Sequence, residues 1–204
     1  MIRTRIIIFA KAPQPGFAKT RLIPALGAEG AAELAQQMLS NTLFEALAAD
    51  IGTVELCITP KIDDIAWQGI ELPVGIEITG QGEGNLGERM ARASERAIKN
   101  AELVLLIGTD CVEISATLLR EAAQSLHEHD AVIHCTADGG YALLGLKRYS
   151  AVLFSDMPWS TDAVASTTIA RIGQLGWSLH VGQLLHDVDT PQDLKYLPTK
   201  MELA

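Results

Sequence analysis

Short apolar runs alternate with longer segments of helical periodicity along this chain, and this alternation constrains its fold more than any other feature. The run at residues 6–9 is continuous and apolar, which is typical of a strand buried on both faces. The run LVLLIGTDC at residues 103–111 is the most strand-like of the chain, whereas apolar residues recur at helical spacing between residues 31 and 47. Strands and helices that alternate in this way predict an α/β fold with right-handed crossovers and a mainly parallel sheet covered on both faces.

The same patterns predict the remaining elements. Further strands are expected at residues 54–59, 131–135, 141–146 and 177–181, and further helices at 86–97, 115–126, after 161 and, as a short one, after 191. No linker, low-complexity tract or repeat interrupts the chain. With 204 residues, of which 48% are hydrophobic, the sequence predicts a single domain over residues 1–204.

A basic loop follows the first predicted strand directly, in the sequence KAPQPGFAKTR. The ending Lys19-Thr20 suggests a nucleotide P-loop, but Pro13 and Ala18 stand where that motif needs its two glycines. Lys19 and Arg21 lie two residues apart, so an extended segment would point both cations to one side, where they could bind phosphates. The alternative is a solvated surface loop, since charged residues are mostly exposed.

Two aspartates could complete a site with this loop. Asp110 directly follows the central strand, and Ser115 is the better cap for the next helix, which leaves Asp110 free for a ligand. Asp189 lies in HDVDTPQDL, where Thr190 and Pro191 equally well begin a helix. Ligands of such sheets bind outside the carboxyl ends of the strands, so the basic loop and Asp110 should be neighbours. Asp110 and Asp189 together suggest a Mg²⁺ or Mn²⁺ site that also holds substrate phosphates.

The overall charge and the cysteines exclude several classes of protein. Twenty-five acidic and sixteen basic residues give a net charge of −9 at pH 7, which opposes binding to nucleic acid or to an anionic membrane. The three cysteines are widely spaced and form no CxxC pair, so neither a disulfide framework nor a zinc site is indicated. No apolar stretch near the N-terminus is long enough for a signal or a membrane span. We expect a cytoplasmic protein that binds small molecules.

Six ordered blocks of this sequence resemble a known family. AKAPQPGFAKTRLIPALG, GEGNLGERM, LIGTDCVEI, ADGGYALLGL, MPWSTDAV and HDVDTPQDL occur between about residues 6 and 195. Their order and spacing are similar to those of a bacterial family of glycosyltransferase-A-like proteins, often labelled radical-SAM/selenodomain-associated transferases. That family lies in the superfamily of nucleotide-diphospho-sugar transferases, which includes molybdopterin-cofactor and phospholactate nucleotidyltransferases. The resemblance implies a Rossmann-like three-layer αβα sandwich.

The resemblance also implies roles for particular residues. The catalytic cations would be Lys19 and Arg21, although prolines replace most glycines of the usual loop. The metal ligands would be Asp110 and Asp189. The nucleotide would be bound by Lys11, Ala12, Pro13, Lys19, Asn85 and Arg89, and the acceptor would lie against Asp138, Gly139, Gly140, Tyr141 and Trp159. Each of these groups also has a purely structural alternative. Asn85 and Arg89 could only support a turn and a solvated helix, and Asp138 and Gly139 could form an ordinary turn. Ser160 or Thr161, next to Trp159, could cap a helix.

The function that follows is a metal-dependent nucleotidyltransferase, in which a small phosphorylated acceptor attacks the α-phosphate of a nucleoside triphosphate. One alternative is a glycosyltransferase with a nucleotide-sugar donor, although the Asp-x-Asp motif of many such enzymes is missing. The other is a nucleotide-binding regulator without turnover.

Overall fold

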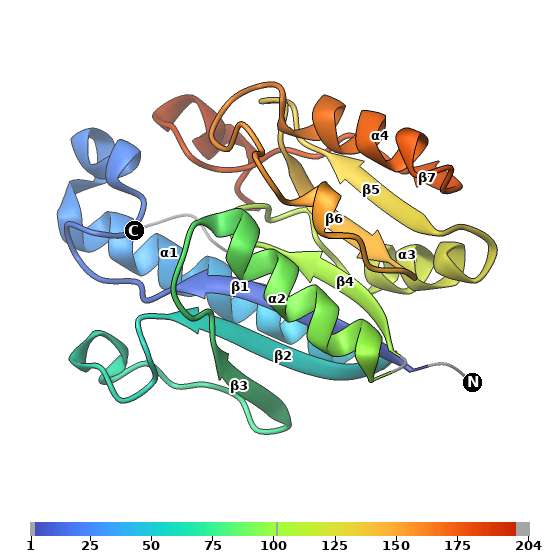
Figure 1. The fold of residues 1–204 in the computed structure, drawn as a ribbon. Coiled ribbons are helices and arrows are strands. Elements are labelled where there is room, and N and C mark those ends of the chain that lie inside the picture. Colours follow the sequence, from blue (N-terminus) through green and yellow to red (C-terminus); the bar gives the residue numbers. More distant parts are fainter. Residues whose placement is uncertain (1–2, 101, 199–204) are drawn as a thin grey trace.

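The central feature of the fold is a seven-stranded sheet with the order β3-β2-β1-β4-β6-β5-β7. The computed structural model describes residues 3–100 and 102–198 (Figure 1). The strands are β1 Thr4–Lys11, β2 Gly52–Thr59, β3 Ile76–Gly80, β4 Leu103–Ile107, β5 Ala131–Cys135, β6 Tyr141–Leu146 and β7 Leu179–Val181. Strand β6 is antiparallel to β4 and β5, and the other pairs are parallel. The predicted mainly parallel sheet is confirmed.

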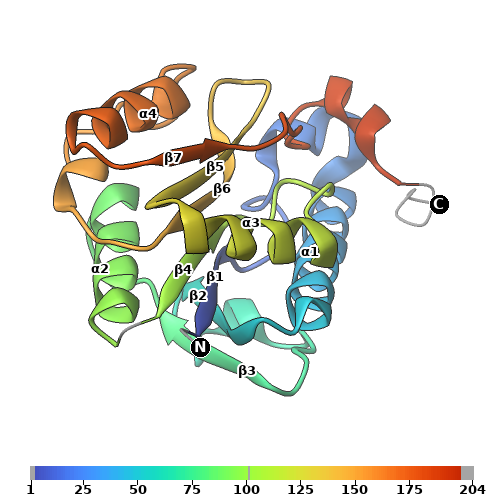
Figure 2. The ribbon, with the colours of Figure 1, turned by 90° about the vertical axis from the view of Figure 1, so that its right-hand side faces the viewer.

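In the described part of the chain, four α-helices cover the two faces of this sheet. They are α1 Ile23–Ala49, α2 Leu86–Lys99, α3 Ala116–Glu128 and α4 Val164–Gln174. Helices α1 and α3 lie on one face, and α2 and α4 on the other (Figure 2). Short 3-10 turns at Thr20–Leu22, Ile65–Trp67, Ala151–Leu153 and Pro191–Tyr196 complete the connections. The result is the expected Rossmann-like three-layer sandwich.

Strand β1 shows why a continuous apolar run predicted burial on both faces. Ile6 and Ile8 pack in the cluster that includes residues of α1 and α3, whereas Ile7 packs in the cluster under α2 and α4. All three side chains are fully buried. Alternate side chains of a strand point to opposite faces, so a strand covered on both sides must be apolar at every position.

Several boundaries differ from the predicted ones. Strand β3 was not predicted, because it lies at the sheet edge with mostly exposed side chains and has little apolar signal. Helix α1 begins at Ile23, before the periodic segment, and contains a break at Gly27, whose φ is 73°. Helix α4 begins at Val164, and the position before it is Ala163, so neither Ser160 nor Thr161 caps it. Thr161 instead accepts a hydrogen bond from the Ala163 N–H and donates one to the Pro158 carbonyl.

Within the described residues, no helix is both long enough and apolar enough to cross a membrane.

Candidate functional site

The loops after β1 and β4 meet at one edge of the sheet, as the parallel arrangement of these strands requires. A third segment, at residues 185–190, runs alongside them. Cys111 forms an isolated antiparallel bridge with Asp187, and the Val188 N–H donates to the Asp110 carbonyl at 2.8 Å. This pairing holds the late aspartates against the residues that follow the central strand.

The basic loop is not extended at its end, which corrects one prediction from the sequence. Lys19 has left-handed backbone angles (φ 46°, ψ 45°) and begins the 3-10 turn Thr20–Leu22. The Leu22 N–H donates to the Lys19 carbonyl at 2.8 Å, and the Leu22 side chain is fully buried. Burying Leu22 turns the chain inward, so Lys19 and Arg21 do not share the side of an extended segment.

Lys19 is bound between the two aspartates that the sequence singled out. Its ammonium donates to Asp110 Oδ1, to Asp189 Oδ1 at 3.0 Å and to the Val188 carbonyl at 2.8 Å. The side chain is only 7% exposed. Burial disfavours the charged form, but the charges of Asp110 and Asp189 outweigh it, so the pKa of Lys19 is raised. All three ammonium protons are thus used within the protein.

Asp187 is a residue of this site to which the sequence assigned no role. Burial, followed by the charges of Asp110, Asp138 and Asp189, raises the pKa of Asp187 to about 7. The signal was present in HDVDTPQDL, where Asp187 and Asp189 alternate with Val188. The sequence could not show that Asp138, from the turn between β5 and β6, would approach the same point.

The donor chemistry around Lys19 suits a divalent cation. Two carboxylate oxygens and one carbonyl oxygen converge on its ammonium, and oxygen donors of this kind are those that Mg²⁺ prefers. Within residues 3–100 and 102–198, no group of three or more His, Cys, Asp or Glu side chains is placed to hold a metal ion. The side chains that would hold such an ion are therefore Asp110 and Asp189, whose Oδ1 atoms now bind the Lys19 ammonium.

Two cavities meet at this point. The larger one, of about 580 Å³, and the smaller one, of about 390 Å³ under the basic loop, share five lining residues, namely Phe9, Arg21, Leu86, Asp110 and Asp189. Lys11 and Lys19 line only the smaller cavity. Of these two cavities, Asp138 and Trp159 line the larger one and not the smaller one. The site thus consists of a basic compartment and an acidic one, with Arg21 in both.

The expected acceptor residues come together in the larger cavity. Asp138, Gly140, Tyr141 and Trp159 line it. Asp138 also forms the expected turn, since its Oδ1 accepts hydrogen bonds from Thr136 Oγ1 at 2.5 Å and from the Gly140 N–H at 3.1 Å. Gly139 is not a lining residue.

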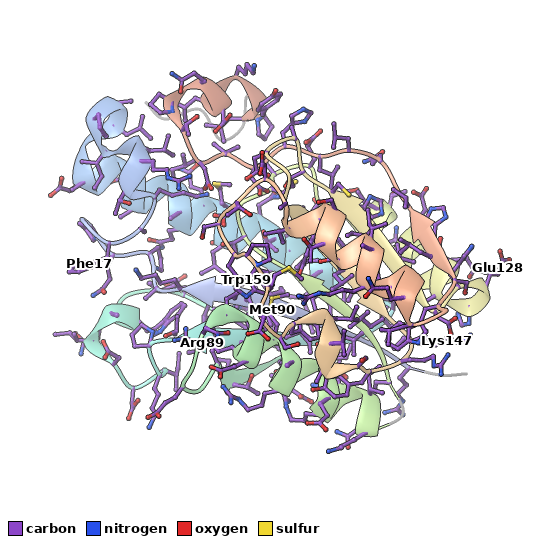
Figure 3. All side chains as sticks on the ribbon, turned by 45° about the horizontal axis from the view of Figure 1, so that its top comes forward. Phe17, Arg89, Met90, Glu128, Lys147 and Trp159 are labelled. Carbon is purple, nitrogen blue, oxygen red and sulfur yellow. The ribbon has the colours of Figure 1, made fainter. Side chains whose placement is uncertain are left out.

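The expected nucleotide residues are only partly brought together. Asn85 caps α2, accepting from the Glu88 N–H at 3.0 Å, and Arg89 donates to the Gly84 carbonyl at 2.8 Å. Both side chains therefore support the turn before α2, and neither is among the residues that line the two cavities. Ala12 and Pro13 are buried, whereas Phe17 of the same loop projects outward (Figure 3).

Comparisons with known proteins agree with this architecture. A family model described as "Uncharacterized protein conserved in bacteria (DUF2064)" matches residues 42–161. A comparison with curated proteins gave no match.

Solved structures share the fold over almost the whole chain. A "putative nucleotide-diphospho-sugar transferase" from Desulfovibrio desulfuricans G20 is 28% identical, with a TM-score of 0.89, over 98% of this chain and 88% of that one. A CMP:2-keto-3-deoxy-manno-octonic acid synthetase complexed with CTP is 12% identical, with a TM-score of 0.58, over 95% of this chain and 96% of that one. The Rv0371c protein of Mycobacterium tuberculosis H37Rv, in complex with manganese, is 16% identical, with a TM-score of 0.56, over 96% of this chain and 97% of that one. The expected fold of nucleotide-diphospho-sugar transferases is confirmed.

Proposed function

We propose that this chain, which belongs to the DUF2064 family of bacterial proteins, is a metal-dependent nucleotidyltransferase acting on a nucleoside triphosphate and a small acceptor. The observation that carries the proposal is the meeting of a basic and an acidic cavity at Arg21, Asp110 and Asp189. Two adjoining compartments suit two substrates that react where they touch. The names of the similar structures, one a synthetase bound to CTP, support nucleotide transfer.

The smaller cavity suits the phosphates of the nucleotide. Lys11, Lys19 and Arg21 line it, and they can neutralise charge on a triphosphate, Arg21 by paired hydrogen bonds. Lys19 reaches a phosphate only when it gives up its bonds to Asp110 and Asp189. A divalent ion held by those two aspartates would supply charge neutralisation at the α-phosphate.

The reaction needs no protein nucleophile. An acceptor oxygen forms a bond to the α-phosphorus, the bond from that phosphorus to the bridging oxygen breaks, and pyrophosphate leaves with the electron pair. Arg21 lies where it can stabilise the charge that develops on the transferred group, because it lines both cavities. Arg21 and Lys19 are therefore the proposed catalytic cations.

Binding measurements test this proposal. Isothermal titration with ATP, GTP, CTP, UTP and UDP-glucose, with and without Mg²⁺ or Mn²⁺, should show one triphosphate that binds tightly only with metal. Preference for UDP-glucose would support the glycosyltransferase instead, a possibility that the 28% identical structure keeps open. Absence of nucleotide binding would overturn both. Tight binding without pyrophosphate release over a broad acceptor panel would indicate a regulator.

A further inference from the structure

We infer, on the basis of the proposed nucleotidyl transfer, that the larger cavity takes an uncharged, partly apolar acceptor that reacts through a hydroxyl group. The sequence had favoured a phosphorylated acceptor. The lining of the cavity, its charge and one buried hydroxyl group favour the neutral molecule.

One wall of the larger cavity is apolar. Met90 of α2 and Leu106 of β4 belong to one buried cluster, and Phe9 of β1 and Trp159 pack against it. Trp159 is half-buried, so part of its indole remains free to cover a ligand. An acceptor with an aromatic or aliphatic body gains by removing this surface from water, whereas a small polar phosphate ester leaves it uncovered.

The lining of the larger cavity is also strongly acidic. Five aspartates line it, at positions 110, 138, 162, 187 and 189, and Arg21 is the one basic side chain among the lining residues that the structure describes. Lys19 lines the smaller cavity and is not among the residues that line this one. A divalent ion at Asp110 and Asp189 would balance those two carboxylates. It would leave the carboxylates of Asp138 and Asp162, together with Asp187, whose raised pKa of about 7 leaves it only partly charged at neutral pH. A phosphorylated acceptor would therefore enter against a net negative lining, while a neutral one would not.

The two kinds of acceptor also differ in the proton that the reaction must remove. A hydroxyl group loses its proton as its oxygen bonds to the α-phosphorus, and that proton can pass to a carboxylate of the lining and then to solvent. A phosphate acceptor reacts through an oxygen that is already ionised. Carboxylates therefore assist a hydroxyl nucleophile and only repel a phosphate nucleophile.

Tyr141 adds a polar group to the apolar part of the cavity. It lines the cavity at the start of β6, and its hydroxyl is buried without a hydrogen-bond partner in the described part of the chain. Buried polar groups are normally paired. An acceptor oxygen contacts this hydroxyl only when the Tyr141 side chain shifts toward the cavity, and it then gains a hydrogen bond without breaking one that the protein already makes.

The first test compares 2-phenylethanol with 2-phenylethyl phosphate, which share one body and differ in charge. Binding to the full chain is followed by ligand-observed NMR without nucleotide, so the result does not depend on whether the proposed nucleotide transfer is correct. We expect the alcohol to bind at least about tenfold more tightly than its phosphate ester. Equal or tighter binding of the phosphate ester, or no binding of either probe at millimolar concentration, overturns the inference.

Variants locate the binding in this cavity. Trp159→Ala should weaken alcohol binding about tenfold and Trp159→Phe less, whereas Phe44→Ala, at an exposed residue of α1 outside the cavity, should not change it. Asp162→Asn should improve binding of the phosphate ester relative to the alcohol, and Asp63→Asn, at an exposed residue elsewhere, should not. If Trp159→Ala and Phe44→Ala behave alike, the probe binds elsewhere and the inference fails.

Tyr141→Phe separates a binding role from a structural one. It removes a buried hydroxyl that has no partner, so the melting temperature should not fall, yet binding of the alcohol should weaken. Unchanged affinity in a folded Tyr141→Phe protein would contradict the part assigned to this hydroxyl.

Discussion

The Lys19 ammonium donates a hydrogen bond to Asp110, a residue 91 positions later in the chain, and the same ammonium donates to Asp189. The cation expected to bind phosphate and the carboxylates expected to bind metal are thus bound to each other in the protein alone. Any divalent ion that uses both carboxylates must compete with Lys19. This relationship makes metal affinity and the position of Lys19 two aspects of one equilibrium.

Lys19→Met should therefore raise the affinity for Mn²⁺ in the absence of nucleotide, by about tenfold or more, because the competing cation is removed. Without metal, the same variant should melt at a lower temperature, because Asp110 and Asp189 are left unpaired. Mn²⁺ titrations followed by electron paramagnetic resonance and by thermal unfolding measure both effects. Lys11→Met is the matched control, since Lys11 is exposed and its ammonium donates to the Phe17 carbonyl rather than to a carboxylate of the described residues. Weaker Mn²⁺ binding by Lys19→Met would show that the lysine supports the metal site.

Asp110→Asn should lower metal-dependent triphosphate binding by at least about tenfold, because it replaces one charged oxygen ligand by a neutral amide of the same shape. The fold should persist, since Ser115 rather than Asp110 caps α3. Calorimetric titration with triphosphate and Mg²⁺ checks this result against Asp50→Asn, at a left-handed position after α1 that asparagine tolerates. Equal binding by Asp110→Asn and the unchanged protein would remove Asp110 from the metal site.

Glu55 should make stability depend on pH far from the cavities. It is fully buried and hydrogen-bonds Arg5, Arg96 and Thr79. Burial acts to raise the pKa of Glu55, but these partners outweigh it, so the pKa lies below the ordinary value of 4.5. The stabilisation that ionised Glu55 provides is therefore complete above about pH 4.5. It is lost as the pH falls through the lower pKa that Glu55 has in the folded protein.

Glu55→Gln should lower the free energy of unfolding at pH 7 by about 3 kcal/mol and flatten this acid-dependent loss. Urea denaturation at pH 7 and at about pH 4 measures both changes, with Glu71→Gln at an exposed site as the control. A Glu55→Gln protein that loses stability in acid as steeply as the unchanged protein would exclude Glu55 as the source.

Gly139→Ala should destabilise the protein and displace the backbone of Asp162, a residue that lines the larger cavity. The φ of Gly139 is 91°, and a Cβ there would lie 2.2 Å from the Asp162 carbonyl oxygen, which is backbone and cannot move freely. We expect a loss of about 3 kcal/mol or more in the free energy of unfolding. Gly69→Ala is the control, because Gly69 has a φ of 76° but open space around it, and it should lose only about 1–2 kcal/mol. Urea denaturation measures both losses. Equal losses for the two variants would show that the contact between the new Cβ and Asp162 is relieved without a cost in the free energy of unfolding.

Local patterns in the sequence predicted most of the fold. The apolar run at β1 predicted a strand buried on both faces, and Ser115 predicted the start of α3, because each depends on residues only a few positions apart. Strand β3 was missed because an exposed edge strand needs few apolar residues. The order of the strands then placed the basic loop and Asp110 at one edge.

The sequence by itself determined that cations and carboxylates would meet at the carboxyl ends of β1 and β4. Tertiary structure alone decided how they pair: Lys19 is bound to Asp110 and Asp189, while Asp187 joins them from the third segment. Asp110 and Asp189 lie 91 and 170 positions from Lys19 in the chain. No local periodicity specifies such contacts, because they depend on how loops pack once the sheet has formed and on the inward turn that buries Leu22.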